Sequence, residues 1–180
     1  MRHLLLIAPL TLALAGCPLN DVLNPTPTTT APAATGAAAP AQPMNIATFL
    51  NRVEAARGTA LTVAEKSQVT VAAQQTRGMI DGAQQKFLGA VGGAIGLDAA
   101  TVGLLFPNAA QPVSAPVVQK ALESKLGKQL SGYESTAVNA ATTLRNNSLT
   151  SLKSGLANKV GGTIGLPGET VLALLPLLGL

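Results

Sequence analysis

The sequence predicts an all-α fold: a small helical bundle built from two tandem three-helix repeats. Two observations lead to this prediction. Beyond residue 44, apolar residues recur at steps of three and four, which is the helical period, and no segment sustains the two-residue alternation of a half-buried strand. In addition, shifting the chain by 69 residues aligns two of its segments without a gap.

The repeat is clearest near the ends of the two copies. VGGAIGLDAATVGLLFP (91–107) lies over VGGTIGLPGETVLALLP (160–176), with ten of seventeen positions identical. The same register continues upstream, where Glu54, Gly58, Leu61 and Glu65 lie over Glu123, Gly127, Leu130 and Glu134. Self-similarity at a fixed period indicates a repeated structural unit. We therefore expect one domain at 44–180, with repeat one at 44–107 and repeat two at 113–176, packed as one bundle or as two small linked bundles.

The first helix of each repeat is expected at about 45–57 and 115–126. A glycine follows each of them, at Gly58 and Gly127, where a left-handed C-terminal cap is expected. The second helix then begins at a capping box, a hydroxyl residue followed three positions later by a glutamate: Thr62 with Glu65, and Ser131 with Glu134. A capping role makes a catalytic role for these two glutamates a weak interpretation.

The second helix is long in both repeats, and its apolar stripe is predicted from residue identity. In repeat one the stripe is Val69, Ala72, Ala73, Met79, Ile80, Ala83, Phe87, Val91 and Ile95; in repeat two it is Val138, Ala141, Leu149, Leu152, Leu156, Val160 and Ile164. The glutamines on this helix, Gln74, Gln75, Gln84 and Gln85, are expected to face solvent, and Tyr133 is expected to be a packing residue.

A short third helix completes each repeat. Gly96 and Gly165 are expected to cap the long helix, with Leu97 and Leu166 folding back against it. The third helix then starts at Asp98 or Pro167, which are favoured helix-start residues. Pro107 and Pro176 are expected to end or kink it.

Composition excludes most catalytic chemistry from residues 44–180. The only histidine is His3 and the only cysteine is Cys17, so a Ser–His–Asp or Cys–His mechanism, or a His/Cys metal site, cannot be built there. Carboxylates remain, but the aromatic platforms that usually accompany sugar-cleaving carboxylate pairs are almost absent. We expect no enzyme activity, no catalytic residue, no cofactor and no metal. The formal net charge of +4 is spread without a basic run, which argues against a nucleic-acid partner.

The N-terminal residues have the pattern of an export signal. A short basic start precedes an apolar run at 4–15, which is too short to span a membrane. The run ends in Leu14-Ala15-Gly16-Cys17, which resembles the lipobox of bacterial lipoprotein precursors. The resemblance implies a signal peptide at 1–16, recognised through Leu14, Ala15 and Gly16, and acyl chains such as palmitate attached at Cys17.

The position after the lipidated cysteine gives an expectation about location. In lipoproteins an aspartate there tends to retain the protein in the inner membrane, whereas this chain has Pro18. The resemblance therefore implies a cell-envelope protein, at the outer membrane rather than the inner one where two membranes exist. Residues 17–43 form the lipidated N-terminus and a linker rich in Pro, Thr and Ala, which is expected to be disordered.

Three functions follow as hypotheses. The first is a non-catalytic structural or partner-binding domain, held to the membrane by its lipid. The second is a membrane-active protein whose glycine-rich segment Gly89-x-x-Gly92-Gly93-x-x-Gly96 resembles a glycine zipper, so that it inserts or oligomerises at the bilayer. The third is a carrier of a small apolar ligand held between the two repeats. Self-association through an apolar patch is a further possible form of partner binding.

Overall fold

The structure is a computed structural model that describes residues 44–180. These residues form helices only: α1 Ile46–Arg57, α2 Val63–Ile95, α3 Ala99–Leu105, α4 Ala115–Leu126, α5 Gly132–Ile164, α6 Gly168–Leu174 and the 3₁₀ turn η1 Leu175–Leu178. This part of the chain contains no strand, so the all-α prediction is confirmed for it. The helices α4, α5 and α6 begin and end 69 residues after α1, α2 and α3 (115 against 46, 132 against 63, 168 against 99).

Both long helices begin at the predicted capping boxes. The Thr62 hydroxyl accepts from the Glu65 N–H, and the Glu65 carboxylate accepts from the Thr62 N–H at 2.7 Å. Ser131 and Glu134 make the same pair of bonds at the start of α5. Each box pairs two of the N–H groups that the first turn of a helix leaves free.

Four helices end at the predicted glycines, all with the left-handed φ that a side chain disfavours: Gly58, Gly96, Gly127 and Gly165. After α2 and α5 the chain turns back at once. The Leu97 N–H donates to the Gly92 carbonyl and the Leu166 N–H to the Gly161 carbonyl, both at 3.0 Å. The short helices then start at Asp98 and Pro167 as predicted.

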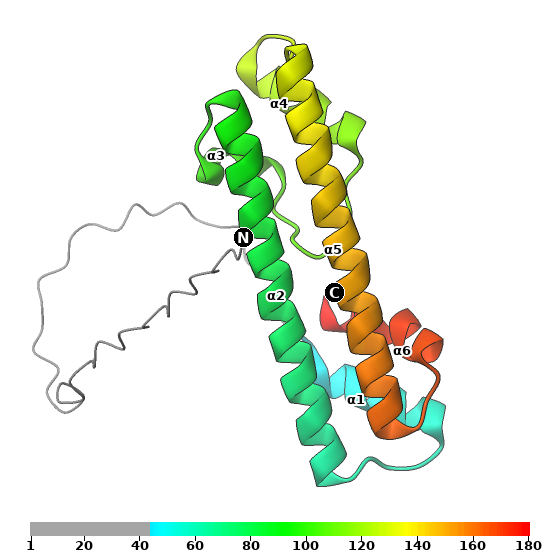
Figure 1. Cartoon of the computed structure of the whole chain (residues 1–180). Helices are drawn as coiled ribbons and strands as arrows, with labels where there is room; N and C mark the ends of the chain where they lie inside the picture. Colours follow the sequence, from blue (N-terminus) through cyan, green and yellow to red (C-terminus); the bar gives the residue numbers. More distant parts are fainter. Residues whose placement is uncertain (1–43) are drawn as a thin grey trace, which may run out of the picture. The chain divides into compact units, whose positions relative to one another are not determined.

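The long helices α2 and α5 run antiparallel along their whole length (Figure 1). At one end of the pair α1 contacts α6 and η1, and at the other end α3 contacts α4. The first helix of each half of the domain therefore meets the third helix of the other half. The 106–114 connection leaves α3, runs toward the middle of the helix pair and returns to α4 at the same end (Figure 1).

Two buried clusters hold these ends together. One joins α1, α5, α6, η1 and the start of α2, with Phe49, Val53, Leu156 and Leu175 among its members. The other joins α3, α4, the end of α2 and the start of α5, with Val91, Val102, Leu122 and Val138 among its members. Each cluster draws on both halves of the chain, so neither half buries its apolar residues alone.

Three side chains differ from the sequence predictions. Met79, expected in the apolar stripe, is 52% exposed, and Tyr133, expected to pack, is 80% exposed. Tyr133 precedes the buried Val138 by five residues, which rotates it about 140° away from the buried face. Gln84, expected in solvent, is 6% exposed.

The reason for these differences is that the buried stripe of the long helices is not purely apolar. In α2 it passes through Thr76, Ile80 and Gln84, and in α5 it passes through Thr142 and Arg145. A prediction from apolar residues alone therefore includes the exposed Met79 in the buried stripe and omits the buried Thr76 and Gln84. The other three glutamines, Gln74, Gln75 and Gln85, are exposed as predicted.

Candidate functional site

The residues named as sites from the sequence are Leu14, Ala15, Gly16 and Cys17, and they lie outside the described residues. The predicted signal peptide and linker lie there too. Within 44–180 no three His, Cys, Asp or Glu side chains gather in a way that could hold a metal ion. The candidate site described below rests on other residues.

The glutamates around each capping box bind the loop between two helices. The Glu54 carboxylate accepts from the Leu61 N–H at 2.9 Å and pairs with Lys66 at 2.8 Å. Glu123 accepts from the Leu130 N–H at 3.1 Å. Glu65 pairs in turn with Arg57 and Glu134 with Lys128. These carboxylates therefore hold the α1–α2 and α4–α5 connections in place.

The same hydrogen bonds lower four carboxyl pKa values. The main cause of the lowered pKa of Glu65 is the hydrogen bond from the Thr62 N–H. For Asp98 it is the hydrogen bond from the Thr101 N–H, at 2.7 Å. In Glu134 the Ser131 hydroxyl, and in Glu54 the Lys66 ammonium, are the first cause. The folded state thus favours the ionised form of each group.

We expect stability to fall at acid pH. A carboxyl whose pKa is lower in the folded state stabilises the fold above its unfolded pKa, here the ordinary 4.5 of a glutamate, and this contribution is lost as the pH drops through the folded value. The melting temperature followed by circular dichroism should therefore decrease steadily below about pH 4.5. A Glu65→Gln and Glu134→Gln double variant should show a shallower decrease, and an unchanged melting temperature down to about pH 2.5 would contradict the assignment.

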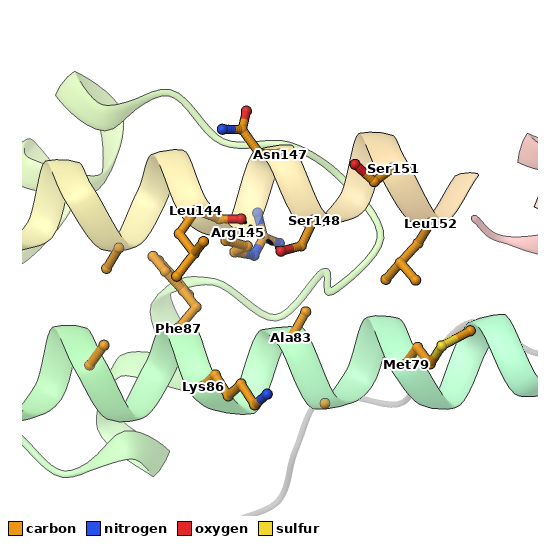
Figure 2. A pocket seen from close by; sticks show the side chains of 13 residues that line it. Met79, Ala83, Lys86, Phe87, Leu144, Arg145, Asn147, Ser148, Ser151 and Leu152 are labelled. Atoms are coloured by element: carbon orange, nitrogen blue, oxygen red, sulfur yellow. Dashed lines mark hydrogen bonds between the residues drawn. The ribbon is translucent and has the colours of Figure 1, made fainter. Parts of the chain in front are cut away.

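A groove of about 740 Å³ lies between the middle parts of α2 and α5 (Figure 2). All of its lining residues belong to these two helices. Its walls are mainly apolar, with Met79 opposite Leu152 at one end and Phe87 beside Leu144 at the other (Figure 2). Met79 and Leu144 are largely exposed, so the groove has open apolar edges. This volume is in the ordinary range for small-molecule pockets.

The floor of the groove contains a buried arginine. Arg145 is 2% exposed, and its guanidinium Nε donates to Gln84 Oε1 at 2.6 Å. Its Nη2 donates to two backbone carbonyls, that of Asn108 at 2.8 Å and that of Ala109 at 3.2 Å. Gln84 donates in turn to the Phe106 carbonyl at 2.7 Å. These bonds attach the α3–α4 connection to the middle of the helix pair.

Arg145 also lies beside aromatic side chains and a second cation. Its guanidinium carbon is 5.2 Å from the centre of the Phe87 ring, which packs edge to face on Phe106. No carboxylate of residues 44–180 forms an ion pair with Arg145. Burial lowers the pKa of Arg145, and burial followed by the Arg145 charge lowers the pKa of Lys153. The middle of the domain thus holds a cationic charge that no described anion neutralises.

This cluster was not found by sequence reasoning. The sequence pattern predicts Gln84 in solvent and gives Arg145 no role. One signal was available: Gln84 and Arg145 fall on the helical period of their neighbours Ile80 and Leu149, at steps of four. A polar residue in phase with an apolar stripe is a candidate for a buried polar network.

The apolar segments considered for membrane contact are partly buried within the domain. Val91, Gly92 and Ile95 lie in the α2 end, and Leu175, Leu178 and Leu180 cover the other buried cluster. In residues 44–180 no single helix has the length and apolarity to cross a membrane, although two sharply bent pairs, α2 with α3 and α5 with the segment ending at Leu178, meet that criterion together. Bent pairs of this kind also occur in the buried cores of proteins outside membranes.

Comparison of the chain with protein-family models, with curated proteins and with solved structures finds no match.

Proposed function

We propose that the chain is a lipid-anchored cell-envelope lipoprotein whose helical domain has a non-catalytic, partner-binding role. Support for the anchor comes from the lipobox at Leu14–Cys17, and support for the outer membrane comes from Pro18. The observation that carries the binding role is the groove between α2 and α5, which has open apolar edges and contains no carboxylate, imidazole or thiol among its lining residues.

The positions of the carboxylates favour binding over catalysis. Five of them accept hydrogen bonds from backbone N–H groups at helix ends or in the loops beside them: Glu54, Glu65, Asp98, Glu123 and Glu134. Asp81 pairs with Arg77 on the surface of α2. An acid–base pair would need two carboxyl groups facing one cleft, and these groups are used elsewhere.

We further propose that the domain consists of two tandem three-helix repeats, 44–107 and 113–176. The support is the common spacing of 69 residues between corresponding helix bounds, together with the two capping boxes and four glycine caps at the same relative positions. In this proposal the groove lies between the two repeats, since one long helix comes from each.

A second candidate function is the carriage of a small apolar ligand. The specific observation in its favour is the chemistry of the groove wall, where Met79, Ala83, Phe87, Leu144 and Leu152 present carbon atoms to the cavity. Ligand pockets are characteristically concave and mostly apolar, with a few polar groups that orient the ligand.

The anchor is tested by mass spectrometry of the chain produced in a bacterium with two membranes. We expect the wild-type protein to lack residues 1–16 and to carry two or three acyl chains on residue 17, since one chain alone anchors weakly. Cys17→Ala should carry none and should keep residues 1–16, because the dedicated peptidase acts on the lipidated cysteine. A wild-type protein of unmodified mass would contradict the proposal.

A second experiment distinguishes lipid anchoring from direct membrane insertion by the helical domain. The chain beginning at residue 18 has no lipid and, once mixed with liposomes and centrifuged on a density gradient, should stay at the bottom as a helical species. Flotation of this chain would favour direct insertion of the glycine-rich helix ends instead.

A further inference from the structure

We infer that the groove between α2 and α5 binds a single-chain amphiphile with an anionic head group, its alkyl chain lying on the apolar wall and its head group near Lys86. This inference rests on the proposed binding role of the domain and names the ligand class for it. The shape of the groove and its charge both support this ligand class.

The groove has the shape that an alkyl chain requires. It extends along the facing surfaces of the antiparallel helices α2 and α5 rather than into a closed cavity (Figure 2). Its lining on the α2 side runs from Met79 through Ala83 to Ala90, which is about three turns of helix or roughly 16 Å. An open apolar groove of this length suits an extended chain better than a compact ring system.

The charge of the groove selects the head group. Its only ionisable lining residues are Lys86 and Arg145, both cations. Lys86 is exposed on the edge, where its ammonium can contact a ligand directly, whereas the Arg145 guanidinium is buried in the floor. Lys153 lies outside the groove lining, but it is close enough to Arg145 for the two charges to repel each other. An anion bound at Lys86 would bring a negative charge to a groove whose ionisable lining residues are both cations.

The alternative occupant is a second copy of the chain. The α2 surface at the groove contains Gly82, where an added Cβ atom would have no neighbour within 4 Å. Open glycines allow close approach of another helix, but a second copy related by a twofold axis would bring its own Lys86 and Arg145 to the same surface. Like charges placed together at an interface are unfavourable, so the charge of the groove favours an anionic ligand over self-association.

The test is a titration of the chain beginning at residue 18 with three twelve-carbon probes. Dodecanoate and dodecylammonium are used below their micelle concentrations, and dodecanol is used below its solubility limit. We expect dodecanoate to bind with one-to-one stoichiometry in isothermal titration calorimetry, at least about tenfold more tightly than the other two. Lys86→Glu should weaken dodecanoate binding by about tenfold or more. Gly82→Leu should also weaken it by about tenfold or more, because a leucine side chain at this lining position would obstruct the groove.

Two control variants match these changes. Lys120→Glu reverses an exposed charge on α4. Gly162→Leu adds a side chain at an exposed glycine of α5, roughly 15 Å beyond Leu152, the nearest lining residue of the groove. Both should bind dodecanoate as the wild type does. Since leucine favours a helix more than glycine does, Gly82→Leu should stay folded, which circular dichroism checks.

The outcomes separate the inference from the proposed function. Equal binding of dodecanol and dodecanoate, weakened in Gly82→Leu, would overturn the anionic head group and leave the carrier role standing. Absence of binding by all three probes would overturn both the inference and the carrier role, while the lipid anchor would still stand on its mass spectrum. Dodecanoate binding that Gly82→Leu leaves unchanged would place the site elsewhere. A wild-type dimer that Gly82→Leu converts to a monomer would assign the groove to a second copy.

Discussion

Gly92→Ala is expected to destabilise the domain by about 2–3 kcal/mol, although alanine is the better helix former. Gly92 lies in the last turn of α2, and a Cβ atom there would overlap the carbonyl oxygen of Leu97. This oxygen belongs to the backbone of the tight turn that the Leu97 N–H closes on the Gly92 carbonyl. The turn cannot move aside without losing that hydrogen bond, so the clash must be relieved by opening the end of the helix.

The neighbouring glycine provides the control. An added Cβ at Gly93 would meet no atom, so Gly93→Ala should raise stability by up to about 1 kcal/mol. The free energy of unfolding in urea would show both effects in opposite directions. Equal changes at the two positions would mean that the turn after α2 is not held as described.

Gly161→Ala should repeat the result at the other end of the domain. A Cβ there would lie 2.6 Å from the Leu166 carbonyl oxygen. Because the two glycines lie beside different buried clusters, the losses in the double variant should add, to about 4–6 kcal/mol in total. A loss of that size is a large share of the stability of an ordinary domain.

The helix ends were predictable from the sequence because they depend on near neighbours. A hydroxyl three residues before a glutamate, and a glycine after an apolar stripe, act within one or two turns, and the predicted starts at Thr62 and Ser131 are confirmed. The turns that follow the long helices at Gly96 and Gly165 were predictable for the same reason. All of these signals are local, and the chain repeats them at an offset of 69 residues.

The packing of the helices was not predictable in the same way. Periodicity gives the face that a helix buries but does not give the helix that covers it, so the meeting of α1 with α6 and of α3 with α4 had to come from the structure. Similarly, the groove depends on which residues of α2 lie opposite which residues of α5. The apolar period within each helix does not determine how the two helices are aligned along their length.

The buried polar cluster was missed for a different physical reason. Glutamine and arginine are usually exposed, so a reading that assigns burial from residue type places Gln84 in solvent. Gln84 is buried because both ends of its amide have partners, the Arg145 guanidinium and the Phe106 carbonyl. Those partners are 61 and 22 residues away, and no local pattern connects them.

Gln84→Leu is accordingly expected to cost about 3–5 kcal/mol, far more than the loss of a surface glutamine. The leucine would leave the Phe106 carbonyl without its hydrogen-bond donor. It would also remove the acceptor of the Arg145 Nε–H, and Arg145 is a buried cation with no ionic partner among residues 44–180. Hydrogen bonds to charged groups contribute about 1.5–3 kcal/mol, and an unpaired buried carbonyl costs about 1–3 kcal/mol. Chemical denaturation followed by circular dichroism measures the change.

Gln85→Leu is the matched control, because the neighbouring glutamine is exposed and should change stability by no more than about 0.5 kcal/mol. Adding Arg145→Met to Gln84→Leu removes the charge that the first substitution left without its partner. The double variant should therefore lose less stability than the two single losses combined, by about 0.5–3 kcal/mol. Strict additivity would show that Gln84 and Arg145 act independently, and a Gln84→Leu protein as stable as Gln85→Leu would show that the cluster does not hold the 106–114 connection to the helix pair.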